Sequence, residues 1–206
     1  MLGELLQAAT SDDAIIARAK ATVSNRRSEP TMDEISELCA DAALPVRPEV
    51  GRLLYMLVRV TRPSNVVEFG TSFGASLLYL AAGVHDNGFG KVLGTEMSSK
   101  KIAKAQHNLQ RVGLAEHALI VQGDARETLA NIPPPVDLVL LDGWKDLYLP
   151  VLQVLEPKLR PGTVVLADNL SMLPAAYLEH VRAPGSHYVS ISLPLGDGVE
   201  LSLRVA

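Results

Sequence analysis

The chain has 206 residues, of which 48% are hydrophobic and 20% are charged, and its formal net charge is -4. This size and composition are typical of one globular domain with a sizeable core. The acidic balance argues against the basic surface that binding to nucleic acid or to an anionic membrane would need. We therefore expect a single domain over residues 1–206 and neither a nucleic-acid nor a membrane partner.

The first residues do not have the pattern of a secretory signal. Glu4 stands where such a signal carries positive charge, and the stretch lacks an apolar run and a cleavage site. The longest apolar runs, such as LLYMLV, are far shorter than the ~18 residues needed to span a bilayer. The single cysteine, Cys39, excludes an intrachain disulfide and is compatible with a reducing compartment. We expect a cytoplasmic protein, with Cys39 in a helix packing face rather than as a reactive thiol.

Residues 1–62 are predicted to form a helical extension of the domain. Helical patterns cover residues 11–25, 31–44 and 47–60. At the start of the second pattern, Thr31 and Glu34 have the spacing of a capping box. These apolar helices are candidates for a lid or for the face of a homodimer.

From Val66 onward, short β-branched runs alternate with helical segments. The runs VVEFG, VLGTEM, ALIVQGD, VDLVLLDG and TVVLADN are continuously apolar, as is typical of parallel strands covered on both faces. The last two runs, YVSISLP and GVELSLRV, alternate and predict an antiparallel hairpin. The sequence therefore predicts a Rossmann-like, doubly wound α/β fold over residues 63–206. Its seven-stranded sheet would be mostly parallel, with the hairpin at the C-terminal end.

The run VVEFGTSFGAS places Glu68, Gly70 and Gly74 between the first strand and the next helix. Ligands of open parallel sheets bind at this junction, and glycine lets the backbone approach them closely. The spacing is not that of the G-x-G-x-x-G fingerprint, which weakens a nicotinamide or flavin interpretation. Glu68 is better suited to the ammonium group of a cofactor such as S-adenosylmethionine. The alternative is a tight strand-to-helix turn with an incidental glutamate.

The next two strands also end in acidic residues. Glu96 stands where a carboxylate accepts the hydroxyls of a ribose. Asp124 and Ala125 follow the third strand, where side chain and backbone would meet the edge of an adenine. Acidic residues after strands are common, so each signal is weak alone. Together they predict an adenosyl cofactor.

Oxygen ligands end the fourth and fifth strands. Asp142 follows the fourth strand, and Asp168 and Asn169 follow the fifth. A small number of oxygen ligands suits Mg²⁺, which keeps waters and shares its shell with substrate. The histidines show no metal-ligand spacing. The alternative for Asp168 and Asn169 is a turn that caps the next segment.

Lys145 lies three residues after Asp142. A metal, a sulfonium group and partial burial would all favour a neutral amine, which can act as a general base. The alternative is a surface lysine paired with Asp146. Trp144, the only tryptophan, is either a core residue or a flat wall against the adenine.

With these residues in place, the chain resembles the catechol O-methyltransferase family of class I S-adenosylmethionine-dependent enzymes over roughly residues 44–182. The most specific stretches are LDGWKDLYLPVL, GTVVLADN and EFGTSFGAS, and the first is close to L-D-H-W-K-D-R-Y-L-P of the vertebrate enzymes. The resemblance implies that Asp142, Asp168 and Asn169 bind Mg²⁺ and that Lys145 is the general base, so that Lys145 and Asp142 form the catalytic pair.

The same resemblance implies a set of cofactor-binding residues. The backbone of Val46, with Glu68, Gly70 and Ser76, would hold the methionyl end, and Glu96 would hold the ribose. The full expected set is Val46, Glu68, Gly70, Thr71, Ser72, Gly74, Ser76, Glu96, Met97, Asp124, Ala125, Asp142 and Trp144.

Three departures from the family bear on the methyl acceptor. Gly143 replaces the family's histidine, Ile191 lies near the place of a catechol-binding glutamate, and DAALPV offers no aromatic wall. Methyl transfer is therefore better supported than catechol itself. We predict a Mg²⁺-dependent O-methyltransferase for a small molecule with vicinal hydroxyls, such as a catechol-like phenol or a natural-product intermediate. The rivals are a metal-independent methyltransferase for protein or RNA, a non-catalytic adenosyl-binding module and, third, a dehydrogenase.

Overall fold

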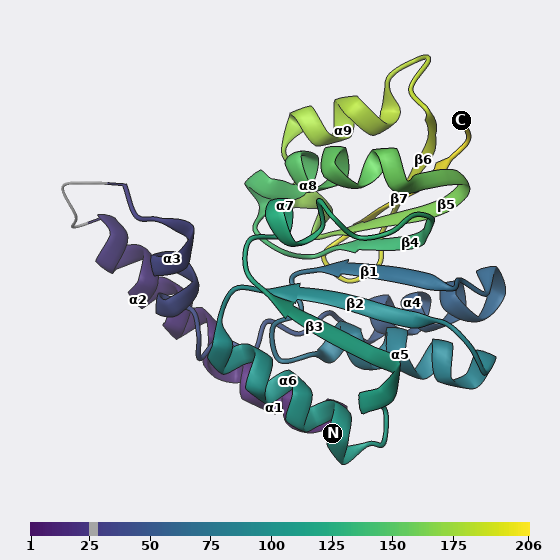
Figure 1. The fold of residues 1–206 in the computed structure, drawn as a ribbon. Coiled ribbons are helices and arrows are strands. Elements are labelled where there is room, and N and C mark those ends of the chain that lie inside the picture. Colours follow the sequence, from purple (N-terminus) through teal and green to yellow (C-terminus); the bar gives the residue numbers. More distant parts are fainter. Residues whose placement is uncertain (25–28) are drawn as a thin grey trace.

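A seven-stranded sheet runs through the computed structural model, which describes residues 1–24 and 29–206 (Figure 1). The strands are β1 (Asn65–Phe69), β2 (Lys91–Glu96), β3 (Ala118–Gln122), β4 (Val136–Leu141), β5 (Leu159–Asp168), β6 (Tyr188–Leu193) and β7 (Val199–Arg204). Their order in the sheet is β3-β2-β1-β4-β5-β7-β6, and β7 runs antiparallel to both of its neighbours. The predicted fold class, with its terminal hairpin, is confirmed.

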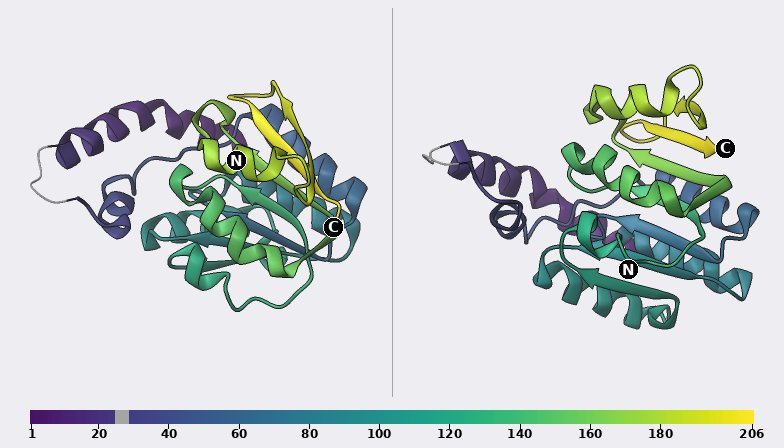
Figure 2. Two further views of the ribbon diagram at one scale, coloured as in Figure 1. Left: turned by 90° about the horizontal axis from the view of Figure 1, so that it is seen from above. Right: turned by 45° about the horizontal axis from the view of Figure 1, so that its top comes forward.

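Helices cover both faces of the sheet (Figures 1 and 2). One layer contains α4 (Pro48–Thr61), α5 (Ala75–Asn87) and α6 (Ser99–Arg111), and the other contains α7 (Ala125–Thr128), α8 (Tyr148–Leu155) and α9 (Ala175–Arg182). Short 3-10 turns are η1 (Ala9–Ser11), η2 (Ala115–His117), η3 (Lys145–Leu147), η4 (Glu156–Lys158) and η5 (Leu170–Met172). Successive residues of a strand point to opposite layers, so Leu140 joins the first core and Leu141 the second. This explains the continuous apolar runs.

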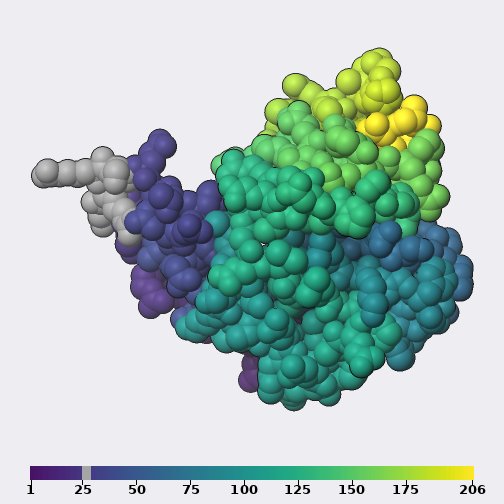
Figure 3. All heavy atoms as spheres, viewed as in Figure 1, coloured from purple at the N-terminus to yellow at the C-terminus, as the bar shows by residue number. Residues whose placement is uncertain are grey.

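Three helices precede α4: α1 (Leu2–Ala8), α2 (Asp12–Ser24) and α3 (Met32–Leu38). Helix α1 packs against the body of the molecule, where Leu5 joins the first core, whereas α2 and α3 project from it (Figures 1 and 3). The predicted capping box is present, because Thr31 N donates to Glu34 Oε2 over 2.9 Å and Glu34 N donates to the Thr31 hydroxyl. The helix expected over residues 11–25 is confirmed up to Ser24, and Asn25 lies outside the described residues.

The helix expected over residues 31–44 is shorter than predicted. It ends at Leu38, and Cys39 is its buried C-cap, so the thiol is packed as expected but lies just beyond the helix. A turn over residues 39–41 follows, then a segment without regular structure in which Leu44 has a φ of 41°, which a right-handed helix does not allow. In the described part of the chain, no helix combines the length and the apolar character that crossing a membrane requires.

Candidate active site

The loops after β1 and β4 meet at Gly70. Its φ is 97°, and an added Cβ would lie 2.6 Å from the carbonyl oxygen of Asp142 and from the backbone nitrogen of Gly143. Asp142 N also donates to Phe69 O over 2.9 Å. Only glycine allows both this backbone conformation and this close approach. Gly70 therefore places the loop after β1, the glycine loop, directly beside Asp142.

The rest of the glycine loop lies over the end of β2. The amides of Gly70 and Thr71 both donate to Thr95 O, at 3.2 and 3.0 Å. Gly74, with a φ of 88°, is the N-cap of α5, and the buried Ser76 lies in the first turn of that helix. The helix N-terminus thus faces the same end of the sheet as the loop, where backbone amides can meet a ligand.

Glu68 is fully buried at the end of β1. The Thr71 hydroxyl donates to its Oε2 over 2.6 Å, whereas its Oε1 has no hydrogen-bond partner within the described chain. Burial raises the pKa of this carboxyl to about 7. A buried carboxylate oxygen without a partner is costly unless a cation or donor reaches it. The position therefore fits the ammonium group of an amino-acid moiety.

Glu96 is fixed by three backbone amides. Ser72 N donates to Oε2 over 2.9 Å, and Met97 N and Ser98 N donate to Oε1 over 2.8 and 3.0 Å. The carboxylate thereby ties the loop after β1 to the start of α6. Because each carboxylate oxygen has about two acceptor sites, Oε1 is fully used, and Oε2 can still accept one hydroxyl group.

Asp124 accepts hydrogen bonds from Arg126 at both of its carboxylate oxygens, and its expected place beside an adenine stays a prediction. It caps α7 through Arg126 N at 2.8 Å, and the Arg126 guanidinium beside it lowers the pKa of its carboxyl. An adenine at this place would therefore meet the backbone and the buried Ala125 rather than a free carboxylate. Trp144 is half-buried and packs against the core on the α8 side, whereas its role as a wall against the adenine stays a prediction.

Lys145 lies among oxygen atoms at the ends of β4 and β5. Its Nζ is 2.6 Å from Asn169 Oδ1, 2.6 Å from the Tyr148 hydroxyl and 3.7 Å from Asp142 Oδ1. The alternative of a surface lysine paired with Asp146 is wrong, because the Lys145 side chain is only 19% exposed and points to these three groups. The structure thus places Lys145 next to residues that are expected to bind metal.

Tyr148 is a site residue that the sequence analysis missed. It is fully buried, accepts a hydrogen bond from Lys145 and lies 3.3 Å from Asp168 O, to which its hydroxyl donates. Its position one helical turn after Lys145 was the available signal, since a buried tyrosine hydroxyl usually needs a polar partner.

Of the two carboxyl groups of this site, that of Asp168 is buried and that of Asp142 is largely so, with 11% of its side chain exposed. Burial, and then the charge of Asp168, raises the pKa of Asp142 well above its usual range, and burial also raises the pKa of Asp168. Burial lowers the pKa of Lys145. Two neighbouring carboxylates in such surroundings cannot both ionise easily without a cation between them.

The donor set fits a hard divalent cation. Asp168 Oδ1 is buried without a hydrogen-bond partner in the described residues. Asn169 has a φ of 62°, and its amide oxygen accepts a hydrogen bond from Lys145. Within residues 1–24 and 29–206, no group of three or more histidine, cysteine, aspartate or glutamate side chains could hold a metal. A metal here would therefore combine two carboxylates with the Asn169 amide and with waters or substrate.

The structure explains the glycine at position 143. A Cβ on Gly143 would lie 2.4 Å from Cζ of Phe69, so the phenyl ring fills the space that a larger side chain would need. Ile191 is 58% exposed on the edge strand β6 and supplies no polar group. The hairpin turn instead brings Asp197 to Arg47, whose Nε lies 3.1 Å from Asp197 Oδ2.

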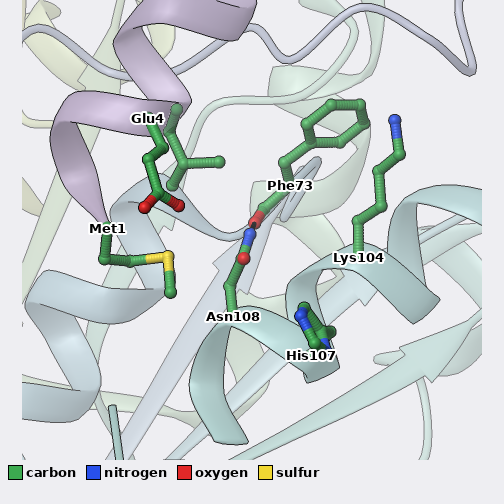
Figure 4. Close-up of a pocket in the computed structure, with 7 residues that line it drawn as sticks. Met1, Glu4, Phe73, Lys104, His107 and Asn108 are labelled. Carbon is green, nitrogen blue, oxygen red and sulfur yellow. Dashed lines mark hydrogen bonds between the residues drawn. The ribbon is translucent and has the colours of Figure 1, made fainter. Parts of the chain in front are cut away.

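A separate hollow of about 220 Å³ lies behind the glycine loop. Figure 4 shows its lining side chains from α1, the loop and α6. Asn108 Nδ2 donates to Phe73 O over 3.0 Å, and Lys104 Nζ lies 3.9 Å from the centre of the Phe73 ring. None of the expected site residues lines this hollow. It lies instead where α6 packs against the glycine loop. The lining residues are Met1, Glu4, Leu5, Phe73, Lys104, His107 and Asn108.

Comparisons with known proteins show the family of the chain. A family model described as a methyltransferase domain matches residues 67–170. The chain is 32% identical over 176 residues to catechol O-methyltransferase of Sus scrofa, covering 78% of this chain and 92% of that enzyme. It is 30% identical over 163 residues to catechol O-methyltransferase of Niastella koreensis, covering 77% of this chain and 66% of that enzyme.

Solved structures agree on the fold. The O-methyltransferase TomG of Streptomyces achromogenes, solved in complex with S-adenosylmethionine, superposes with a TM-score of 0.72 at 22% identity, covering 92% of this chain and 96% of that one.

Proposed function

Because the chain belongs to the catechol O-methyltransferase-like family of class I S-adenosylmethionine-dependent O-methyltransferases, we propose that it methylates small molecules with two vicinal hydroxyls and depends on Mg²⁺. The observation that carries this proposal is the position of Lys145, whose Nζ is 2.6 Å from Asn169 Oδ1 and 3.7 Å from Asp142 Oδ1. A base beside buried oxygen ligands is the arrangement needed to remove a proton from a hydroxyl held at the same ligands.

The residues around the glycine loop would bind S-adenosylmethionine. Glu68 would pair with the ammonium group of the methionyl end, and its unpaired Oε1 and raised pKa of about 7 support this role. That end would be surrounded by the backbone of Val46 and by Gly70, Thr71, Ser72, Gly74 and Ser76. Glu96 would accept a ribose hydroxyl at Oε2, which has one amide partner. Met97, Ala125, Trp144 and the backbone of Asp124 would border the adenine.

Asp142, Asp168 and Asn169 would hold the Mg²⁺. When bound, the ion supplies positive charge that lowers the pKa of a hydroxyl on the acceptor. Lys145 would then take the hydroxyl proton at Nζ, and Tyr148 would keep the amine in place by accepting its second hydrogen bond. The acceptor oxygen forms a bond to the cofactor's methyl carbon as the carbon–sulfur bond breaks, which leaves S-adenosylhomocysteine. Positioning of the two reactants would provide much of the acceleration.

The acceptor's second hydroxyl would be fixed without the glutamate of the catechol-specific enzymes. Ile191 is apolar and exposed, so the chain offers no carboxylate at that place. Arg47 and Asp197 form an exposed ion pair, and both charges influence the pKa of Asp168. The apolar Ile191 in place of a carboxylate supports an acceptor class wider than catechol itself, including natural-product intermediates.

The test is methyl transfer from S-adenosylmethionine to a matched panel of acceptors, with products identified by mass spectrometry. We expect catechol and caffeate to be methylated once. Phenol and 2-methoxyphenol should remain unchanged, because phenol has one oxygen and the ether oxygen of 2-methoxyphenol is a poor metal ligand. Equal rates with phenol and catechol would contradict the vicinal-hydroxyl proposal.

Three further predictions from the sequence stay predictions. We propose that residues 1–206 act as one methyltransferase domain, in which residues 1–62 form the helical extension and residues 63–206 the core. The homodimer and the cytoplasmic location are likewise proposed from the sequence alone. Sedimentation of the purified protein would test whether it is a homodimer.

A further inference from the structure

Asp12 is buried at the start of α2, although it belongs to the projecting N-terminal helices. Its Oδ1 accepts a hydrogen bond from Ala43 N and its Oδ2 accepts one from Leu44 N, both at 2.7 Å. Thirty-one residues separate Asp12 from Ala43 along the chain. Both oxygens of one carboxylate therefore hold two successive amides of a distant segment.

That segment touches the glycine loop directly. The Ser72 hydroxyl donates to Ala43 O over 2.9 Å, and Ser72 N donates to Glu96 Oε2, also over 2.9 Å. A continuous series of hydrogen bonds thus runs from α2 through Ala43 to Ser72 and the proposed ribose ligand. Val46, whose backbone is expected at the methionyl end, lies on the same segment and is buried.

Both connected positions have backbone conformations that require external support. Leu44 has a φ of 41° and Ser72 a φ of 48°, which non-glycine residues seldom adopt. Such conformations persist where surrounding contacts hold them. The carboxylate of Asp12 supplies this support at Leu44, and the contacts with Ala43 and Glu96 supply it at Ser72.

Both ends of this series also influence a buried lysine. Lys101, in the first turn of α6, is only 5% exposed, and burial lowers the pKa of its amine, whereas the charges of Glu96 and Asp12 raise it. Removal of Asp12 would leave the amides of Ala43 and Leu44 without their acceptor.

We propose that Asp12 is a positioning residue for the cofactor: it holds residues 43–44, and through them Ser72, in the conformation that binds the adenosyl group. The inference rests on the proposed cofactor-binding roles of Ser72 and Glu96. The N-terminal helices therefore contribute to cofactor affinity without contacting the reacting atoms.

The experiment is titration calorimetry of S-adenosylhomocysteine with wild type, Asp12→Ala, Asp12→Asn and the control Asp13→Asn. Asp13 is the exposed neighbour in the same helical turn, so its variant makes the same charge change as Asp12→Asn without touching residues 43–44. We expect Kd to rise about tenfold in Asp12→Ala, because two buried amides lose their acceptor. Asp12→Asn keeps one acceptor oxygen and should give a smaller rise, and the control should stay within about twofold of wild type.

Steady-state kinetics separate positioning from general damage. The KM for S-adenosylmethionine should rise with Kd in Asp12→Ala, while kcat at saturating cofactor should fall by less than about twofold. In a double-mutant cycle with Ser72→Ala, the two effects on Kd should be clearly less than additive, since both break one connection. If Asp12→Ala fails to fold, the same measurements on Asp12→Asn decide.

The inference is overturned if Kd for S-adenosylhomocysteine is unchanged in Asp12→Ala, if Asp13→Asn weakens binding equally, or if the effects with Ser72→Ala add fully. Failure of the wild type itself to bind S-adenosylhomocysteine would instead contradict the proposed function. The two failures are therefore distinguishable.

Discussion

The amine of Lys145 lies 2.6 Å from the amide oxygen of Asn169, so the proposed base is hydrogen-bonded directly to a proposed metal ligand. A metal ion at Asn169 Oδ1 would compete with the amine for this oxygen. Metal binding and the position of the base are therefore coupled, with Tyr148 as the second acceptor that keeps the amine in the site.

Replacement of Lys145 by methionine should lower kcat by about 10²–10⁴-fold, the usual contribution of a general base. Binding of S-adenosylhomocysteine should change little, because Lys145 is not among the proposed cofactor ligands. Steady-state kinetics and calorimetry check the two parts. Lys20→Met, which removes an exposed lysine on α2, is the control and should behave like wild type.

Tyr148→Phe should lower kcat by about tenfold, because Lys145 loses one of its two close acceptors and is held less firmly. The KM for S-adenosylmethionine should not change. Tyr177→Phe is the matched control: its ring packs edge-on against that of Tyr148, at 5.9 Å between centroids, but it lies away from Lys145. Wild-type kcat in Tyr148→Phe would show that the hydroxyl does not position the base.

Cofactor affinity should depend on pH through Glu68. Its pKa of about 7 means that the carboxyl is neutral below this pH and charged above it. Affinity for the ammonium group should therefore increase as pH rises through about 7. Glu68→Gln should bind S-adenosylhomocysteine more weakly and lose this pH dependence. Calorimetry from about pH 6 to about pH 8 measures both.

The same group should affect stability without ligand. Below the unfolded-state pKa of 4.5 the carboxyl is protonated in both states and costs nothing. As pH rises from there through the folded pKa, the unfolded state ionises first, so stability is lost. Urea denaturation should show this loss in wild type and not in Glu68→Gln. An equal loss in both proteins would assign it to other groups.

Gly143→Ala should destabilise the protein by about 1–3 kcal/mol, the usual cost of overpacking, because the new Cβ would meet the Phe69 ring. The second variant Phe69→Leu should relieve part of this cost. Urea denaturation of the two single variants and the double variant tests the coupling. Gly3→Ala, where an added Cβ meets nothing within 4 Å, is the control and should be neutral or slightly stabilising.

The fold was predictable because its signals are local and repeated. Strands buried on both faces give continuous apolar runs, and the alternating hairpin after Pro184 differs from them clearly. The first helix, α1, was not predicted, and the end of α3 was placed too late. Beyond that end, Asp12 holds Ala43 and Leu44, and no local pattern in the sequence reveals this contact.

The candidate site was predictable in its strand-end residues but not in its partners. Topology brings Asp142 and Asp168 together because β4 and β5 are parallel neighbours. The contacts of Lys145 with Tyr148 and Asn169 depend on side-chain directions in the turn after β4. Asp124 shows the reverse case, since Arg126 takes up a carboxylate that the pattern left free for adenine.

The central claim is that methyl transfer requires a metal held by Asp142, Asp168 and Asn169. The most direct test is the initial rate of catechol methylation by wild type and Asp168→Ala, after EDTA treatment and after addition of Mg²⁺. We predict that EDTA removes wild-type activity, that Mg²⁺ restores it, and that Asp168→Ala stays inactive while still binding S-adenosylhomocysteine. Full activity in EDTA, or in Asp168→Ala, would contradict the claim.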